Sequence, residues 1–240
     1  MDNKILKLKQ FIADSKKIVV FSGAGISTLS NIPDFRSSDG LYNQDTNLKF
    51  SPEEIISHTF FNKHPQEFYK FYFEKMVYPN ALPNIAHKYF ADLEKNKTVT
   101  IVTQNIDNIH QMAGSSNVIE LHGNVNRNYC QKCHKFYSLN DIYKDRKYIC
   151  DCGGIIKPDV VLYEESLNYN DITRAINAIR NCDMLIVIGT SLMVYPAAGF
   201  INYYNKDKLI LINRDTTPYD DKADIVIHDD IKDVIEQLQK

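Results

Sequence analysis

The chain is predicted to adopt an α/β fold, in which helices cover both faces of a parallel sheet and two insertions form a smaller module. Wholly apolar, strand-like runs such as 184–188 alternate with segments of helical periodicity, which is typical of a parallel sheet buried on both sides. The intervals between the first two strands and between His122 and Val160 are much longer than a crossover helix requires. The second interval holds four of the five cysteines, which marks it as a metal-binding insertion.

Each expected element follows from local periodicity or from a turn signal. Ile5, Leu8 and Ile12 recur at helical spacing, and Ser51-Pro52 followed by two glutamates is typical of a helix start. The aromatic residues of 60–78 stand at three- and four-residue steps, so we expect a packed helical face there. The expected strands cover 18–20, 99–103, 118–121, 184–188, 209–212 and 225–227, and further helices are expected over 85–93, 106–112, 171–180 and 231–238.

We expect a single domain over 1–240 that is divided into two parts. Residues 31–49 are rich in Asn, Asp, Ser and Gly without periodicity, which predicts a long functional loop. The larger part is predicted to comprise approximately 1–35, 83–122 and 158–240, and the smaller module approximately 36–82 and 123–157, with a zinc ribbon at 127–157.

The composition is that of an ordinary globular protein, with 44% hydrophobic and 24% charged residues. A formal net charge of −2 offers no concentrated basic surface, so we expect neither nucleic acid nor a membrane as a partner. No apolar run is long enough to span a bilayer, and no signal-peptide core follows Met1, so we expect a cytoplasmic protein. The sequence does not define an oligomeric state, and a monomer is the simplest expectation.

The paired cysteines Cys130-x-x-Cys133 and Cys150-x-Cys152 have nearly the spacing of a zinc ribbon, but the second pair is one residue short. Three interpretations are open: a four-cysteine site with a tightened second knuckle, a site that uses His134 as a ligand, and a degenerate site without metal. Two glycines directly after the second pair provide backbone freedom, so we favour four thiolates. Because four thiolates leave no position for water, this zinc is expected to be structural.

A glycine turn follows the first strand. Gly23-Ala24-Gly25 precedes the hydroxyl pair Ser27 and Thr28, and such a turn aims backbone N–H groups and a helix start at a phosphate. Thr28 stands where a dehydrogenase fingerprint has its third glycine, and no acidic residue ends a neighbouring strand some twenty residues later. The turn therefore predicts phosphate binding without hydride transfer.

Polar side chains follow several expected strands at their carboxyl ends, where open α/β sheets bind ligands. An imidazole at this edge, His122, is a candidate general base, although a histidine can also simply cap a strand. Asp107 is a candidate ligand-binding residue or a helix cap. The other residues at this edge are Gln104 and Asn105, the second turn Gly189-Thr190-Ser191, and Asn213, each of which could bind a nucleotide or only close a turn.

Taken together, these strings resemble the ordered motifs of the sirtuins, and in particular of bacterial-type sirtuins. The motifs are GAGIS at 23–27, IPDFRS at 32–37, TQNID at 103–107, HG at 122–123, the paired cysteines, KPDVV at 157–161, GTSL at 189–192, PA at 196–197 and IN at 212–213. The resemblance covers nearly the whole chain. It implies an NAD-dependent protein lysine deacetylase with a Rossmann-like sheet, one structural zinc, NAD as co-substrate, and acyl-lysine proteins or peptides as substrates.

The resemblance also implies a role for each matched position. His122 and Asn105 are the implied catalytic residues, and Cys130, Cys133, Cys150 and Cys152 the implied zinc ligands. The peptide is expected to add as a strand beside Val160, Val161, Leu162 and Val194. The implied NAD-binding residues are Gly23, Ala24, Gly25, Thr28, Asp34, Phe35, Arg36, Gln104, Asn105, Ile106, Asp107, His122, Gly189, Thr190, Ser191, Asn213 and the backbone near Ile231.

In the reaction that the resemblance implies, nicotinamide leaves the ribose and the acyl oxygen of the substrate lysine captures the C1′ carbon. His122 then takes a proton from a ribose hydroxyl. The products are nicotinamide, the deacylated lysine and O-acyl-ADP-ribose.

Three positions depart from the family pattern: Asn31 replaces a glycine, Tyr163-Glu164-Glu165 replaces Phe-Gly-Glu, and Lys75 follows Tyr72 where desuccinylating relatives have arginine. Because lysine lacks the bidentate fork of arginine, acetyl groups are the favoured substrate. The alternatives are a preference for longer or acidic acyl groups, mono-ADP-ribosyl transfer to another acceptor, and a non-catalytic zinc-ribbon binding module.

Overall fold

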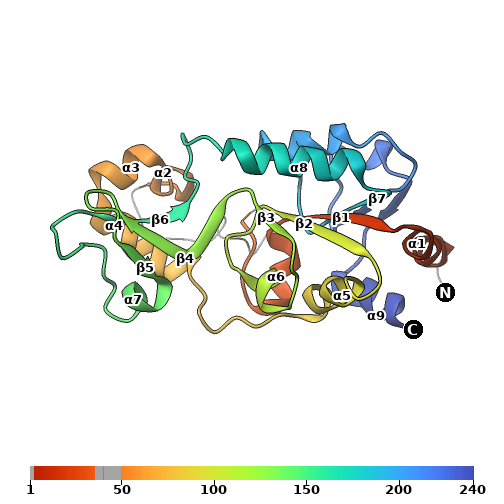
Figure 1. The fold of residues 1–240 in the computed structure, drawn as a ribbon, viewed down its shortest axis with the longest axis horizontal. Helices are drawn as coiled ribbons and strands as arrows, with labels where there is room; N and C mark the ends of the chain where they lie inside the picture. Colours follow the sequence, from red (N-terminus) through yellow and green to blue (C-terminus); the bar gives the residue numbers. More distant parts are fainter. Residues whose placement is uncertain (1–2, 36–39, 41–49) are drawn as a thin grey trace.

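The computed structural model describes residues 3–35, 40 and 50–240, which form two modules side by side along the long axis of the molecule (Figure 1). The larger module contains a six-stranded sheet, and the smaller one contains a three-stranded sheet. Arg36 and residues 41–49 of the expected long loop lie outside the described residues.

The six-stranded sheet is parallel, with strand order β3-β2-β1-β7-β8-β9. The chain builds outward from β1 in one direction and from β7 in the other, so the switch point lies between these two strands, where open sheets place a ligand crevice. The predicted fold class is confirmed, and each expected strand of this sheet is present. The strands are β1 Lys17–Ser22, β2 Thr98–Thr103, β3 Val118–Glu120, β7 Met184–Ile188, β8 Leu209–Ile212 and β9 Ile225–Ile227.

Alternate residues of the central strands enter two separate cores, because successive side chains of a strand point to opposite faces. Ile18 and Val20 belong to one core, and Val19 and Phe21 to the other. The first face is covered by α1 Asn3–Asp14, α5 Ile85–Leu93 and α9 Ile231–Gln239, and the second by α8 Tyr169–Asn181 and the 3₁₀ helix η4 Ala197–Tyr203 (Figure 1). The short elements η1 Ala24–Ser30, α6 Ile109–Met112 and η5 Asp220–Lys222 complete this module.

The small module packs helices against an antiparallel sheet of order β5-β4-β6. Its strands are β4 Gly123–Cys130, β5 Phe136–Ser138 and β6 Ile156–Val160. Its helical elements are α2 Pro52–Ile55, α3 His58–Lys63, α4 Pro65–Phe71, the π-helical turn η3 Tyr72–Met76 and α7 Leu139–Tyr143. Phe61, Phe68 and Tyr72 are buried in its core, as the periodicity of the aromatic segment predicts.

The helix start at Ser51 is confirmed by a capping box. The Ser51 hydroxyl accepts a hydrogen bond from the Glu54 N–H, the Glu54 carboxylate accepts one from the Ser51 N–H, and Pro52 occupies the first helical position. This capping box stabilises the first turn of α2. Among the residues that the structure describes, no helix has both the length and the apolar character needed to cross a bilayer.

Candidate functional site

A cleft of about 470 Å³ lies at the carboxyl edge of the large sheet, and residues of both modules line it. The small module contributes Ile56 and Met76 to the lining of this cleft. The predicted residues that line it are Gly23, Ala24, Gly25, Asp34, Phe35, Gln104, Asn105, Ile106, Asp107, His122, Gly189, Thr190, Ser191 and Asn213, together with Val160, Val161, Leu162 and Val194. The carboxyl ends of five parallel strands, β1, β2, β3, β7 and β8, therefore converge on one cleft, as the sequence predicts.

Two glycine turns touch each other at the switch point of the sheet. The Gly25 N–H donates to the Gly189 carbonyl at 2.8 Å. A Cβ atom on Gly25 would lie 2.8 Å from the Cα of Gly189, and one on Gly189 would lie 2.4 Å from the Ile26 nitrogen. Gly189 also has φ +62°, which glycine adopts without strain. Both turns can therefore bring their backbones to the same ligand only because Gly25 and Gly189 have no side chains.

Ser27 connects the first glycine turn to the loop after β2. Its hydroxyl donates to Asp107 Oδ2 at 2.6 Å and accepts from Asn105 Nδ2 at 3.1 Å. Asp107 Oδ1 accepts from the Ile109 N–H, the first N–H of α6, so Asp107 both supports the helix start and lines the cleft. Burial raises the pKa of Asp107, while the hydrogen bonds from Ser27 and Ile109 act in the opposite direction. The network holds the Asn105 amide and the Asp107 carboxyl in fixed positions at the cleft wall.

His122 lies two residues after the end of β3, and its Nδ1 is 2.8 Å from the Gln104 carbonyl oxygen. A carbonyl oxygen can only accept, so Nδ1 carries the hydrogen and the neutral ring has its lone pair on Nε2. Burial lowers the pKa of His122, and the bond to Gln104 partly opposes this effect. His122 is therefore held as a neutral imidazole whose Nε2 can accept a proton, as a general base requires.

The same histidine joins the two modules through its backbone. The His122 carbonyl accepts from the Val161 N–H at 3.0 Å. Gly123 has φ +81°, and a Cβ atom there would lie 1.9 Å from the Asp159 carbonyl oxygen, so no larger residue fits. The predicted peptide-binding segment 160–162 therefore lies directly beside the candidate base.

Thr190, which follows β7, and Asn213, which follows β8, are each held by neighbouring polar groups. Thr190 Oγ1 accepts from Gln104 Nε2 at 3.1 Å and from the Leu192 N–H at 3.2 Å. Asn213 Nδ2 donates to the Asp215 carbonyl at 2.8 Å. These contacts fix two predicted nucleotide-binding side chains in the cleft.

Two predicted NAD-binding residues do not line the cleft. Thr28 is exposed on η1, and its hydroxyl donates to the Gly25 carbonyl at 3.0 Å. Ile231 begins α9, and its side chain is buried in the core beneath the sheet, which leaves only nearby backbone for a ligand. Their roles toward NAD stay predictions, and the predicted role of Arg36 falls outside the described residues.

The sequence singled out Thr28 and passed over Ser27, although it is Ser27 that lines the cleft. The hydroxyl pair after the glycine turn was the available signal. Only the 3₁₀ geometry of η1 decides which member of the pair points inward. Similarly, Lys75 and Met76 line the cleft at the end of the aromatic segment, whereas Tyr72 is fully buried and has no hydrogen-bond partner for its hydroxyl among the described residues.

The four cysteines of the small module form one cluster, with their sulfur atoms all within 4.8 Å of one another. Cys130 Sγ lies 3.4 Å from Cys152 Sγ, and Cys133 Sγ lies 3.6 Å from Cys150 Sγ. Tetrahedral zinc with Zn–S bonds of about 2.3 Å places its sulfurs roughly 3.8 Å apart, so these positions fit one ion. His134 is not part of the cluster. The arrangement is consistent with structural zinc held by four thiolates.

Glycines allow the shortened second pair to reach the first. Gly153 has φ +79°, and its N–H donates to the Cys150 carbonyl at 2.8 Å. A Cβ atom on Gly154 would lie 2.7 Å from Cys130 Sγ, so the chain passes against the sulfur of the opposite knuckle. This close passage explains how a single intervening residue suffices.

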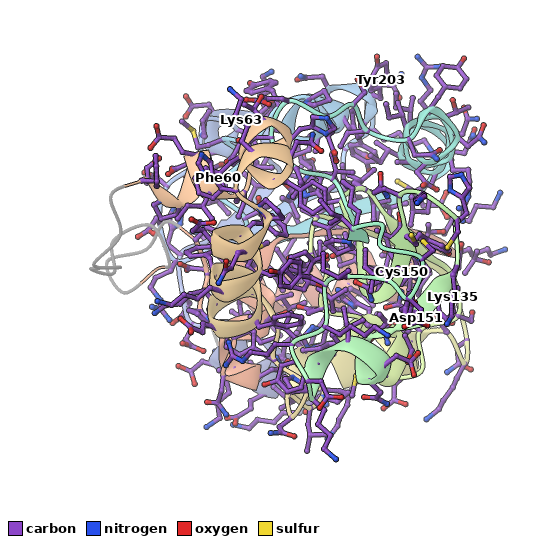
Figure 2. The ribbon with its side chains drawn as sticks, turned by 90° about the vertical axis from the view of Figure 1, so that its left-hand side faces the viewer. Phe60, Lys63, Lys135, Cys150, Asp151 and Tyr203 are labelled. Atoms are coloured by element: carbon purple, nitrogen blue, oxygen red, sulfur yellow. The ribbon has the colours of Figure 1, made fainter. Side chains whose placement is uncertain are left out.

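Tyr137, Lys135, Lys147 and Asp151 form a clamp on the loop that carries Cys150 and Cys152. The Tyr137 hydroxyl donates to Cys150 Sγ at 3.1 Å, and Asp151 accepts from both Lys135 and Lys147 at 2.8 Å. Both ammonium groups lie over the Tyr137 ring, 5.1 and 5.2 Å from its centroid. Figure 2 shows Lys135 and Asp151 beside Cys150. The loop of the shortened pair is thus tied to β5 by contacts that do not involve a metal.

Comparison with known proteins agrees with this architecture. The family model described as the Sir2 family matches residues 23–196. An NAD-dependent protein deacetylase of Clostridium tetani is 56% identical over 232 residues, which are 95% of this chain and 94% of the relative. A solved Sir2 structure with a deacetylated p53 peptide and 3′-O-acetyl ADP-ribose has a TM-score of 0.88 at 35% identity, covering 98% of this chain and 97% of the other. A Sir2–p53 peptide–NAD⁺ structure has a TM-score of 0.81 at 38% identity, covering 97% and 95%. The chain therefore belongs to the Sir2 family.

Proposed function

We propose that this chain is an NAD-dependent deacetylase of protein lysines, which consumes NAD and releases nicotinamide and O-acetyl-ADP-ribose. The observation that carries the proposal is the neutral His122, with Nδ1 bonded to Gln104, in one cleft with the Ser27–Asn105–Asp107 network. The family supports it, since the Clostridium relative is a deacetylase and solved Sir2 proteins bind NAD and acetylated peptide.

In this proposal, the two glycine turns bind the NAD phosphates through backbone N–H groups, and Thr190, Ser191 and Asn213 bind the adenosine half. The Asn105 amide and the Asp107 carboxyl, both fixed by Ser27, face the nicotinamide riboside. Bound NAD supplies an electrophilic ribose carbon, which the acetyl oxygen of the substrate lysine captures as nicotinamide departs. His122 Nε2 then accepts a proton from a ribose hydroxyl, so that this oxygen can attack the acyl carbon.

The acetylated peptide is proposed to bind as an added strand between residues 160–162 and 193–195. Val160, Val161, Leu162 and Val194 all line the cleft, and the Val161 N–H bonds to the His122 carbonyl. A peptide held at this position reaches the cleft beside the base. Such binding depends mainly on hydrogen bonds to the peptide backbone, so many protein sequences can serve as substrates.

The single zinc has no open coordination position and serves structure only. A cytoplasmic monomer without nucleic-acid or membrane partners stays our expectation.

The decisive experiment incubates the purified chain with NAD and an acetyl-lysine peptide and measures the products by mass spectrometry. We expect deacetylated peptide, nicotinamide and O-acetyl-ADP-ribose in equal amounts, and no NAD loss with the unacetylated peptide. Loss of NAD with ADP-ribose attached to protein, and without deacetylation, would instead support mono-ADP-ribosyl transfer. An intact NAD pool with every peptide would contradict both activities.

A second activity, toward acidic acyl groups, is favoured by one observation. Lys75 lines the cleft together with Met76 and Tyr78, which places a lysine on the small-module side of the cleft. Tyr72, by contrast, is buried and does not line the cleft. We expect slower removal of succinyl than of acetyl groups, and a further loss of desuccinylation in a Lys75→Met variant. A panel of acyl peptides measures this, and equal succinyl rates in both proteins would contradict a role for Lys75.

A further inference from the structure

We propose that three buried side chains behind the cleft act as positioning residues for the candidate base: His110, Ser22 and Thr103. They act on the peptide group that joins Gln104 to Asn105. The carbonyl of this group accepts from His122 Nδ1 at 2.8 Å, and its N–H donates to Thr103 Oγ1 at 3.0 Å. One peptide plane therefore connects the base, on one side, to a buried threonine on the other. The inference rests on the proposed function only in giving His122 its role as a base.

The hydrogen bonds among His110, Ser22 and Thr103 have a defined direction. The Ser22 hydroxyl donates to Thr103 Oγ1 at 3.0 Å and lies 3.0 Å from His110 Nε2. A serine hydroxyl has one hydrogen, which is used toward Thr103, so it accepts from an Nε2–H group of His110. Thr103 Oγ1 consequently accepts from both Ser22 and the Asn105 N–H. The chain therefore presents a lone pair to the peptide N–H, and this holds the carbonyl turned toward His122.

His110 is neutral, and its ring hydrogen lies on Nε2 because Nδ1 has no acceptor among the described residues. His110 is 1% exposed, and burial lowers its pKa to about 4, so it is neutral at physiological pH. Its ring packs edge to face against His87, with 4.8 Å between ring centroids, and burial lowers the pKa of His87 as well. His110 Nδ1 and both His87 nitrogens have no hydrogen-bond partner among the described residues. A neutral Nε2–H tautomer of His110 therefore has Ser22 as its one described acceptor.

Loss of the hydrogen bonds that connect His110, Ser22 and Thr103 leaves the Gln104–Asn105 peptide group without its support. Without Thr103 Oγ1, the Asn105 N–H is left buried and unpaired, so rotation of the peptide plane becomes favourable. The Gln104 carbonyl then turns away from His122, and Nδ1 loses the acceptor that fixes the tautomer. In the opposite tautomer Nε2 carries the hydrogen and cannot act as a base.

The test compares two isosteric substitutions in the same strand. Thr103→Val removes the hydroxyl that holds the peptide group, and Thr100→Val is the matched control, because Thr100 Oγ1 accepts from Asn117 Nδ2 at 2.7 Å and does not contact this group. Two readouts are used: the ¹⁵N resonances of the His122 ring at pH 8, assigned with a His122→Asn variant, and steady-state kinetics with NAD and an acetylated peptide.

For Thr103→Val we expect the His122 ring to move from the Nδ1–H tautomer toward a mixture. We also expect kcat to fall about 10- to 100-fold, since general-base catalysis contributes about 10²–10⁴-fold, with little change in the KM for NAD. Thr100→Val should change neither readout, and Thr103→Ser, which keeps the hydroxyl, should restore both. If Thr103→Val is insoluble, Ser22→Ala removes the hydrogen bond that orients the Thr103 hydroxyl, and we expect the His122 tautomer to shift in the same direction.

An unchanged His122 tautomer in Thr103→Val, or in Ser22→Ala if that variant replaces it, would overturn the inference. An equal loss of kcat in Thr100→Val would also overturn it, because the effect would then be a general weakening of β2. A shifted tautomer with unchanged kcat would support the positioning and contradict the catalytic role of His122. The two failures are therefore distinguishable.

Discussion

The cleft edge of the large module and the cysteine cluster of the small module are both polar sites, but different forces hold them in place. At the cleft edge, residues from Gly23 to Asn213 converge because a parallel sheet with a core on each face aligns the ends of its strands. The cysteines lie within one segment, 130–152, beside a single core that is rich in aromatic residues. We therefore expect site geometry to depend mainly on hydrophobic burial in the large module and mainly on metal binding in the small one.

This difference predicts its largest effect when zinc is removed. A strong chelator should unfold the loop and strands around the cysteines, since structural zinc contributes about 10–16 kcal/mol of apparent binding free energy in small zinc domains. Hydrogen exchange should rise in β4, β5 and β6, while β1 and β7 stay protected. Cys133→Ser should reproduce the effect, and Cys182→Ala, outside the cluster, should retain one zinc per chain. Unchanged exchange in metal-free protein would contradict the comparison.

The next largest effect is expected at the cleft edge. His122→Ala should lower kcat/KM for deacetylation about 10²–10⁴-fold, because the general base is lost. The sheet does not depend on this side chain, so NAD affinity measured by calorimetry and the melting temperature should change little. His134→Ala, an exposed histidine of the small module, serves as the control. Turnover of His122→Ala within a few-fold of the parent chain would rule out the proposed mechanism.

Acid should weaken the large module through its buried histidines. Burial lowers the pKa of His110 from 6.5 to about 4, so between these values the unfolded chain binds one more proton than the folded chain. Stability therefore falls as the pH falls through this window, on the order of 1 kcal/mol per pH unit for this histidine. Urea unfolding at pH 7.5, 6 and 5 measures the slope.

The His110→Gln variant isolates this histidine from the zinc site, because acid also releases zinc from thiolates in both proteins. We expect the parent chain to lose stability more steeply with falling pH than the variant does. Equal slopes would show that His110 does not titrate in this window.

The smallest effect is expected for the clamp on the cysteine loop. Tyr137→Phe removes the hydroxyl that donates to Cys150 Sγ, and a hydrogen bond of this kind contributes about 0.5–1.5 kcal/mol. Zinc should pass to a chromogenic chelator roughly 3- to 10-fold faster, in line with such a loss. Tyr143→Phe is the matched control, since Tyr143 packs against Phe73 in the same module. If both variants release zinc at the same rate, the clamp does not stabilise the site.

Much of the fold and the site was predicted from local features of the sequence. The apolar runs define the six parallel strands, because a strand buried on both faces is mostly apolar. The predicted family is confirmed, since its motifs occur in one order along nearly the whole chain. The spacing of the cysteines, with glycines after Cys152, predicted the cluster that the structure contains.

Other features were decided only by the tertiary structure, because they depend on atoms far apart in the chain. The choice of Ser27 over Thr28 depends on the hydrogen bonds of Ser27 with Asn105 and Asp107, which follow a different strand. The contact between Gly25 and Gly189 depends on β1 and β7 being neighbours.

The amino-acid sequence by itself determined which residues follow the strands and which cysteines form pairs, because periodicity and spacing are local properties. The peptide group that holds His122 became visible only in the folded chain. Backbone carbonyls and N–H groups are the same at every residue, and packing alone decides which of them meet.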